Sequence, residues 1–346
     1  MKKLISVVLA LCVLAFSAIP AFAVSFNDGK EALDAQFVFG EGPKADGNSI
    51  DYRFFSPVKD GDTTKYPLVV WLHGMSDGTK DGVQISKSNI SYWTSEEFQS
   101  RFINGGAFIM AARSREEKGD CWSNNMIEPL KAAIDTFIAE NIENIDLTRI
   151  YVGGYSMGGK MTFKMAIAYP EMFAAAFPIC PAWSPSVELL ANLADMPVWI
   201  TSAKADPLVN YFLGVTPTWE KLTGISNVPE TLRLSSLTKV CYEDGKRTSS
   251  SHHAWFAVNH DMFSNENGDY PYMSTVDGNG NEVTLTYPDG MISWLSSHTS
   301  DYNGEASVGK GNLENASATD SLIGITSIIE FFKGLFNTIK ALFALI

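Results

Sequence analysis

The chain has 346 residues and a formal net charge of −13 at pH 7, with 39 acidic against 26 basic residues. Phosphate binding needs clustered Lys and Arg, so this acidic chain is not expected to bind nucleic acid. Its length is enough for one large α/β domain with a well-buried core and additional segments.

The first 23 residues are typical of a secretory signal peptide. Lys2 and Lys3 precede the apolar run 4–16, and small residues at 21 and 23 indicate cleavage after Ala23. The apolar run is shorter than the about 20 residues that cross a bilayer, which argues against an anchor. We therefore expect a secreted or extracellular protein whose folded domain covers residues 24–301.

Three cysteines remain after the leader is removed, namely Cys121, Cys180 and Cys241. Export permits a disulfide, but three thiols leave at least one unpaired, and the pairing stays open. No CxxC pair and no His/Cys ligand spacing is present, so no metal site is expected.

Short, uninterrupted apolar runs in the chain are typical of strands buried on both faces of a parallel sheet. In chain order these runs are 52–56, 66–74, 106–113, 149–153, 173–180 and 197–203. Helical patterns lie between them at 126–140, 157–168 and 187–193. This alternation predicts an α/β fold with a doubly wound, mostly parallel sheet and helices on both faces.

The sequence Gly154-Tyr155-Ser156-Met157-Gly158 lies where a strand pattern meets a helix pattern. A tight bend there projects the central side chain above the sheet, and glycines on either side avoid collisions with the backbone. Ser156 is therefore a candidate nucleophile instead of an ordinary turn serine.

A serine nucleophile needs a base, and the base works best when a carboxylate orients it. Asp206 lies just beyond the strand run 197–203, on the same edge of the sheet as Ser156, and is the candidate acid. His252, His253 and His260 are the candidate bases, and spacing alone does not separate them.

An oxyanion hole needs two backbone N–H groups. We expect one from Met157, at the start of the helix that follows the nucleophile, where the helix dipole helps. The other is expected from Met75, in the loop that follows the strand run ending in His73 and Gly74.

Residues 272–287 alternate apolar and polar side chains around a turn sequence, which predicts a small β-hairpin insertion. The spaced Asp277, Asn279 and Asn281 suggest a calcium loop, but Glu282 occupies the position where such loops need Gly. We therefore expect a turn without calcium.

The C-terminal part departs from the α/β pattern. Residues 302–320 are rich in Gly, Asn, Ser and Ala and predict a flexible linker. Residues 321–346 predict an amphipathic helix with a narrow polar stripe. Such a helix suits a membrane surface or a partner, and packing on its own domain is the alternative.

These motifs resemble the α/β-hydrolase superfamily, and are most similar to the secreted esterases of the polyhydroxybutyrate-depolymerase, feruloyl-esterase and dienelactone-hydrolase-like group. The matching stretches are "YPLVVWLHG", "NIDLTRIYVGGYSMGG" and "YPEMFAAAFPIC". The similarity covers about residues 52–298. Ser251 stands where Gly is usual, and the segment 111–122, the hairpin and the tail also depart from the group.

The resemblance implies a base for the catalytic triad. A His-x-x-Trp motif in related sequences matches His252 and Trp255 and selects His252 as the base. A sister pattern, His-x-Trp, would select His253 instead.

The resemblance predicts a serine hydrolase that cleaves carboxylic esters through an acyl-enzyme, without a cofactor. Only residues 181–196 separate the strand runs at 173–180 and 197–203, too few for a large cap. An open cleft suits bulky or polymeric esters such as acylated or feruloylated polysaccharide. Trp122, Trp183 and Trp255 follow strand ends, where they could stack on a substrate. A prolyl-oligopeptidase-like serine peptidase, an acyltransferase and a surface binding protein on a hydrolase scaffold remain alternatives.

Overall fold

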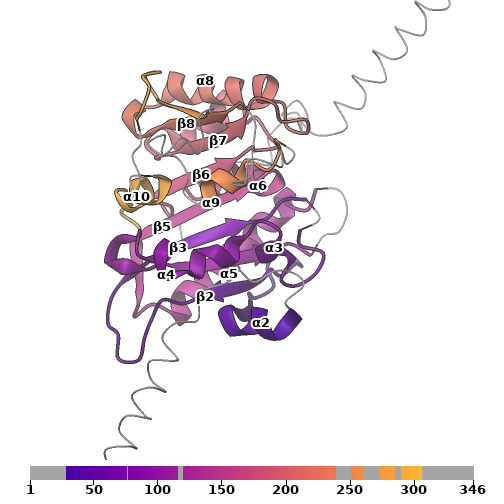
Figure 1. Ribbon diagram of the computed structural model, residues 1–346, viewed down its shortest axis with the longest axis vertical. Helices are drawn as coiled ribbons and strands as arrows, with labels where there is room; N and C mark the ends of the chain where they lie inside the picture. The colour runs from indigo at the N-terminus through magenta and orange to yellow at the C-terminus, as the bar shows by residue number, and fades with distance from the viewer. Residues whose placement is uncertain are drawn as a thin grey trace, which may run out of the picture.

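The computed structural model describes residues 29–75, 77–115, 120–238, 251–259, 273–284 and 290–305. Within these residues a single nine-stranded sheet has the order β1-β2-β4-β3-β5-β6-β7-β8-β9 (Figure 1). The strands are β1 (Val38–Glu41), β2 (Asp51–Phe55), β3 (Tyr66–Leu72), β4 (Phe108–Arg113), β5 (Ile145–Tyr155), β6 (Ala175–Ile179), β7 (Trp199–Ala203), β8 (Arg233–Leu237) and β9 (Met273–Asp277).

Helices connect these strands. The α-helices are α2 (Gly29–Gln36), α3 (Val83–Ser86), α4 (Glu96–Gln99), α5 (Ile127–Glu140), α6 (Met157–Ala168), α7 (Val187–Leu190), α8 (Thr216–Ile225), α9 (Trp255–Asn259) and α10 (Met291–Ser296). Shorter 3-10 segments are η1 (Ile90–Thr94), η2 (Ile103–Gly105), η3 (Asn124–Met126), η4 (Ala191–Leu193) and η6 (Pro229–Thr231), and η5 (Tyr211–Val215) is a π-helix.

Strand direction matches the predicted mostly parallel sheet. Neighbouring strands from β4 to β8 are parallel, whereas the pairs β1/β2, β2/β4 and β8/β9 are antiparallel. β3 lies between β4 and β5. From β3 the chain continues to β4, toward one edge of the sheet, and from β5 it continues to β6, toward the opposite edge. Open α/β sheets bind their ligands at such a reversal, beyond the carboxyl ends of the strands.

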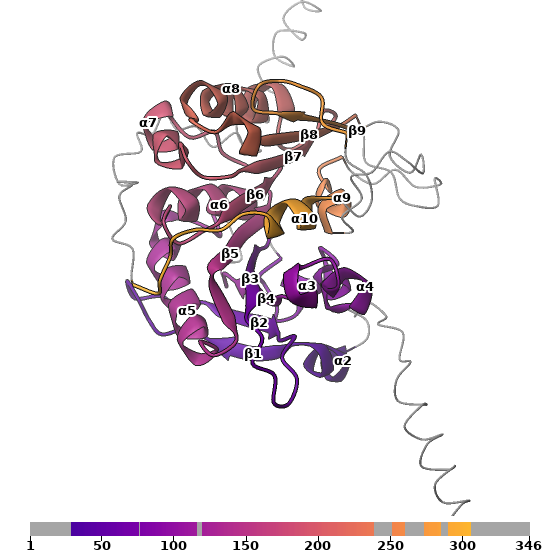
Figure 2. The same cartoon turned by 90° about the vertical axis from the view of Figure 1, so that its left-hand side faces the viewer.

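The sheet is covered on both faces, which explains why central strands such as β3 and β6 are buried at every position. Figure 2 shows α5, α6 and α7 on one side of the sheet, and α3, α4, α9 and α10 on the other. In β3, Leu68, Val70 and Leu72 belong to the core that includes α5 and α6 residues. Val69 and Trp71 point the other way, into the core that includes α9 and α10 residues.

The predicted hairpin is present in the described part of its range. Val283 donates a hydrogen bond to Thr275 across the turn, and Gly280 has a φ of 80°. The Asp277 carboxylate accepts bonds from the Asn279 and Asn281 amides, as in an ordinary turn. β9 also pairs with β8, so the hairpin extends the main sheet.

One boundary differs from the prediction. Tyr302, expected at the start of the linker, is buried in the core on the α5 side, and Ser300 donates to the Thr148 carbonyl. The chain therefore stays packed on the domain beyond residue 301, because an aromatic ring can be buried there.

Several predicted segments lie outside the described residues. They are the leader 1–23, residues 306–320 of the linker, the helical tail 321–346, Cys241 and His260. Across the described ranges, none of the helices combines the length and hydropathy needed to traverse a bilayer.

Candidate active site

Ser156 occupies the bend between β5 and α6. Its backbone has φ 58° and ψ −115°, a conformation that non-glycine residues rarely adopt, and its side chain is nearly buried. A Cβ on Gly154 would lie 2.3 Å from the Leu72 carbonyl oxygen, and a Cβ on Gly158 would lie 2.0 Å from it. The two flanking glycines are therefore required by the close approach of β3.

The structure brings Ser156, His252 and Asp206 together at the carboxyl edge of the sheet. His252 Nε2 lies 2.9 Å from Ser156 Oγ, and His252 Nδ1 lies 2.9 Å from one oxygen of Asp206 and 3.1 Å from the other. All three side chains are buried. This is the order of hydroxyl, imidazole and carboxylate that nucleophilic acyl transfer uses.

The Asp206 carboxylate is held by its own loop. Its Oδ1 accepts hydrogen bonds from the amides of Leu208 and Val209, at 2.8 and 2.9 Å. Backbone donors of this kind orient the second oxygen, Oδ2, toward His252. The loop after β7 thus sets the position of the carboxylate independently of the histidine.

His252 has a pKa above the ordinary value for histidine. Burial alone would lower the pKa, but the hydrogen-bonded Asp206 carboxylate beside the ring outweighs it. The imidazolium that would form during acyl transfer is therefore favoured at this position.

The other two candidate bases take different places. The hydrogen bond to Ser156 comes from His252, whereas the ring of His253 lies 5.8 Å from that of Trp255. Burial lowers the pKa of His253, in the opposite direction to the shift of His252. His260 lies outside the described residues.

The two predicted oxyanion donors come from different segments of the chain. Met157 is the first residue of α6, so its amide is one of those that have no partner within the helix. Met75 follows Gly74 in the loop after β3, which we call the β3 loop (residues 73–75, 77 and 78).

His73 braces the β3 loop. Its Nδ1 lies 2.7 Å from the Gly74 carbonyl, and its Nε2 accepts from the Ser114 amide at 3.1 Å. The ring is fully buried, which lowers its pKa and favours the neutral form with the proton on Nδ1. The contacts that His73 makes are therefore structural, and they hold the loop that also carries Met75.

The predicted role of Trp122 needs correction. Its ring is fully buried, and its indole N–H donates to the His73 carbonyl at 2.8 Å, so it offers no face to a substrate. A side chain just past a strand end points inward when the next loop folds over it, which sequence position does not reveal. Trp183 and Trp255 expose only 4% and 7% of their surface.

Cys180 is close to the candidate triad, which sequence reasoning did not anticipate. Its thiol donates to the His252 carbonyl at 3.4 Å, and both Cys180 and Cys121 are free and buried. Donor atoms of Cys180, Asp206 and His252 lie within 4.8 Å of one another, close enough for one metal ion. A metal there would have to displace the hydrogen bond between His252 and Asp206.

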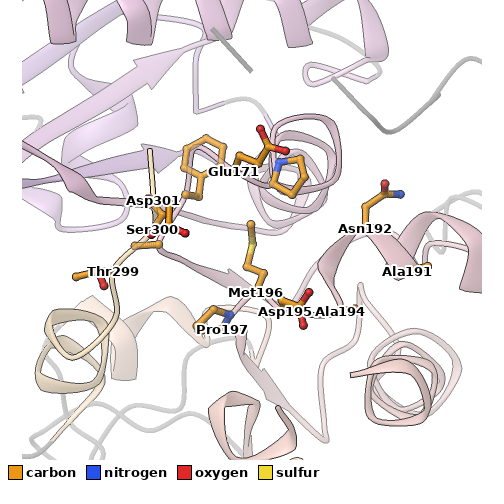
Figure 3. Close-up of a pocket in the computed structure, with 13 residues that line it drawn as sticks. Glu171, Ala191, Asn192, Ala194, Asp195, Met196, Pro197, Thr299, Ser300 and Asp301 are labelled. Carbon is orange, nitrogen blue, oxygen red and sulfur yellow. The ribbon is translucent and has the colours of Figure 1, made fainter. Parts of the chain in front are cut away.

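A cavity of about 620 Å³ lies away from this site. It is bounded by residues that precede β6 and β7, at the amino edge of the sheet, whereas Ser156 is at the carboxyl edge. Figure 3 shows Glu171, Asp195 and Asp301 among its lining side chains. Its position separates it from the hydroxyl and imidazole that could carry out acyl transfer.

The parallel sheet, the strained serine between β5 and α6, and its histidine and carboxylate neighbours define an α/β-hydrolase. Residues 45–259 match the model of the Esterase family, described as "Putative esterase", and this match covers more than half of the chain. The chain therefore belongs to this esterase family.

Curated relatives agree with this placement. The chain is 30% identical to feruloyl esterase B of Neurospora crassa over 139 residues, which are 37% of this chain and 43% of that protein. It is 27% identical to the poly(3-hydroxybutyrate) depolymerase of Ralstonia pickettii over 179 residues, 48% of this chain and 35% of that protein. The chain thus spans less than half the length of the curated relatives it matches.

A solved structure supports the fold. A thermostable esterase superposes with a TM-score of 0.57 at 24% identity, covering 77% of this chain and 64% of that one. Identity at this level establishes the α/β-hydrolase fold and leaves the chemistry to the site itself.

Proposed function

We propose that the protein is a secreted carboxylic-ester hydrolase, with Ser156 as nucleophile, His252 as general base and acid, and Asp206 as the orienting carboxylate. The observation that carries the proposal is the continuous hydrogen-bonded line from Ser156 Oγ through His252 to Asp206, within a chain of the esterase family. The leader predicted at residues 1–23 supports secretion.

In the proposed reaction, Ser156 Oγ attacks the acyl carbon while its proton passes to His252 Nε2. The ester C–O bond then breaks, and the alcohol leaves with that proton. Water gives a proton to His252 and attacks the acyl-enzyme, and the bond to Ser156 Oγ breaks. The acid is released as the proton returns to Ser156.

The negative charge on the acyl oxygen needs preorganised donors. We propose the amides of Met157 and Met75, each of which would be worth about a hundredfold to a thousandfold in kcat. Their placement at the start of α6 and in the β3 loop supports this role.

The proposed substrates are esters carried on bulky or polymeric molecules, such as acyl or feruloyl groups on polysaccharide. The matched relatives are named a feruloyl esterase and a poly(3-hydroxybutyrate) depolymerase, which brackets aromatic and aliphatic acyl groups. The small exposed parts of Trp183 and Trp255 are proposed to contact such a group.

A substrate panel tests the proposal. The full chain would be incubated with p-nitrophenyl esters, feruloylated oligosaccharides, poly(3-hydroxybutyrate) film, an aminoacyl-proline amide and an acyl acceptor. We expect turnover of the esters and covalent labelling by a fluorophosphonate. Faster cleavage of the amide would replace the proposal with a peptidase, and acyl transfer in preference to hydrolysis would replace it with an acyltransferase. No turnover of any substrate, together with no fluorophosphonate labelling, would favour a binding protein.

The raised pKa of His252 predicts opposite pH trends for activity and stability. His252 must be neutral to accept the Ser156 proton, so kcat/KM should rise with pH through a pKa above about 6.5. A raised folded-state pKa stabilises the fold fully below the unfolded value of about 6.5, and this contribution is lost as pH rises through the folded value.

Two measurements check these trends. One is the kcat/KM profile for p-nitrophenyl acetate, and the other is the pH dependence of the unfolding free energy of wild type minus His252→Asn. His253→Asn is the matched control and should leave the acidic limb of the profile in place. A limb at or below pH 6.5, or one that moves with His253→Asn, contradicts the assignment.

We also propose that residues 321–346 attach the protein to a membrane surface or to a partner. Deleting them should leave turnover of soluble esters unchanged and reduce sedimentation with liposomes, because the predicted apolar face is lost. Neutral and anionic liposomes would be compared with the full chain as reference. Equal liposome binding by the two chains would remove this proposal.

A further inference from the structure

A buried hydrogen bond joins the nucleophile bend to the β3 loop. The Tyr155 hydroxyl donates to Asp77 Oδ2 at 2.5 Å, and both side chains are buried, Asp77 completely. Tyr155 immediately precedes Ser156, and Asp77 lies two positions after Met75. The contact therefore links the two backbone segments that carry the proposed oxyanion donors.

The Tyr155 ring also supports the backbone next to Met75. A Cβ placed on Gly74 would lie 2.5 Å from Tyr155 Cζ, so the Gly74 backbone lies directly against this ring. The Gly74 carbonyl also accepts the Asp77 amide at 3.3 Å. Met75 is thus held between Gly74, which rests on the ring, and Asp77, which binds the hydroxyl.

The same ring reaches the proposed base. Tyr155 and His252 ring centroids are 6.1 Å apart, and Trp255, three residues after His252, lies 6.4 Å from Tyr155. On the other side, Tyr155 stacks on Trp71 of β3 at 6.4 Å. One aromatic side chain thus contacts the nucleophile bend, the base segment and the β3 loop.

The electrostatics keep the Tyr155 hydroxyl in its protonated form. Burial and the neighbouring Asp77 carboxylate raise the pKa of Tyr155 far above its usual value, so its hydroxyl stays protonated and donates. Asp77 forms an ion pair with Lys87 at 2.6 Å, which offsets part of the cost of burying its charge. Hydrogen bonds to an ionised acceptor are short and directional, so they suit precise placement of a loop.

We propose that Asp77 and Tyr155 are positioning residues. They hold the Met75 N–H within hydrogen-bond distance of the oxyanion that forms when Ser156 attacks the substrate. The inference rests on the proposed function and adds to it the device that aligns its oxyanion hole. A donor works only about 2.7–3.1 Å from the developing oxyanion, so loosening the β3 loop should lower kcat and spare KM.

The test uses Tyr155→Phe, Asp77→Asn and the double variant in the full-length chain. Tyr169→Phe is the matched control, because the buried Tyr169 also loses a hydrogen bond, from its hydroxyl to Glu128. Tyr169 directly follows α6, so the length of this helix, about 18 Å, separates it from Ser156. Measurements are kcat and KM for p-nitrophenyl acetate, the inhibition constant of an alkyl boronic acid that forms a tetrahedral adduct, and Tm.

We expect Tyr155→Phe to lower kcat about 10- to 100-fold with little change in KM, and to weaken the boronic acid by a similar factor. Asp77→Asn should act in the same direction. The double variant should be no worse than the more severe single variant, because both remove one contact. Tyr169→Phe should lower Tm comparably and leave kcat unchanged.

Two results would overturn the inference. Variants that lose Tm but keep the wild-type kcat and boronic acid affinity would show a purely structural bond, while the ester hydrolase assignment would stand. Wild-type protein that neither hydrolyses esters nor reacts with a fluorophosphonate would remove the proposed function and this role with it. If Tyr155→Phe does not fold, Asp77→Asn, which preserves side-chain shape, gives the same readouts.

Discussion

Replacing Ser156 with Ala should abolish fluorophosphonate labelling and reduce ester turnover by about a hundred-thousandfold or more. The substitution removes the hydroxyl that is hydrogen-bonded to His252 Nε2, and no other atom of residue 156 can attack an acyl carbon. Ala has a Cβ like Ser and adds nothing to the bend, so the fold should persist. Labelling by mass spectrometry and p-nitrophenyl acetate turnover measure the effect.

Ser184→Ala is the matched control for this experiment. Ser184 follows β6 near the same edge of the sheet, and its hydroxyl accepts from Thr218 Oγ1 at 2.8 Å. Its loss should leave both labelling and turnover intact. Full labelling of the Ser156→Ala protein would mean that another nucleophile carries the reaction.

Replacing Asp206 with Asn should lower kcat by about ten-thousandfold. The Leu208 and Val209 amides hold Oδ1, so the amide oxygen of Asn should take that place and the NH₂ group should face His252 Nδ1. His252 Nδ1 then has to accept, which puts the ring proton on Nε2, toward Ser156. In this tautomer the imidazole cannot take the serine proton.

The measurement for Asp206→Asn is kcat on p-nitrophenyl acetate, beside thermal unfolding to establish that the variant is folded. Asp195→Asn removes the same charge from an exposed position at the opposite edge of the sheet and should keep the wild-type kcat. A folded Asp206→Asn protein that retains kcat within about tenfold of wild type would contradict the assigned role of Asp206.

The fold and the bend at Ser156 could be predicted because their signals are local. Most of the buried strands are short apolar runs, since a parallel sheet covered on both faces accepts apolar side chains on either side. The predicted helix 157–168 coincides with α6 because its start follows directly from the strand-to-helix bend. The edge strand β1 and the helix α8 were not predicted, because β1 is largely exposed and α8 carries a mixed pattern.

The active-site residues beyond the bend at Ser156 were harder to predict from the sequence. Three histidines within nine residues leave the base open in the sequence, and only the path of the chain before α9 decides which ring lies 2.9 Å from Ser156. Trp122 was assigned to substrate binding from its position after a strand, yet the loop folds inward and buries it against His73. No sequence motif indicated a role for Asp77, because its partner Tyr155 is 78 residues away in the chain.

By itself, the sequence determined the α/β class, the strand-to-helix bend and the placement of one serine at that bend, because hydrophobic period and glycine placement act over a few neighbouring residues. The tertiary structure decided which imidazole and carboxylate meet that serine, and which side chains brace the β3 loop. Those contacts join segments that are 46 to 96 residues apart. Their distances depend on how the loops at the carboxyl edge of the sheet pack together, and no local pattern encodes this.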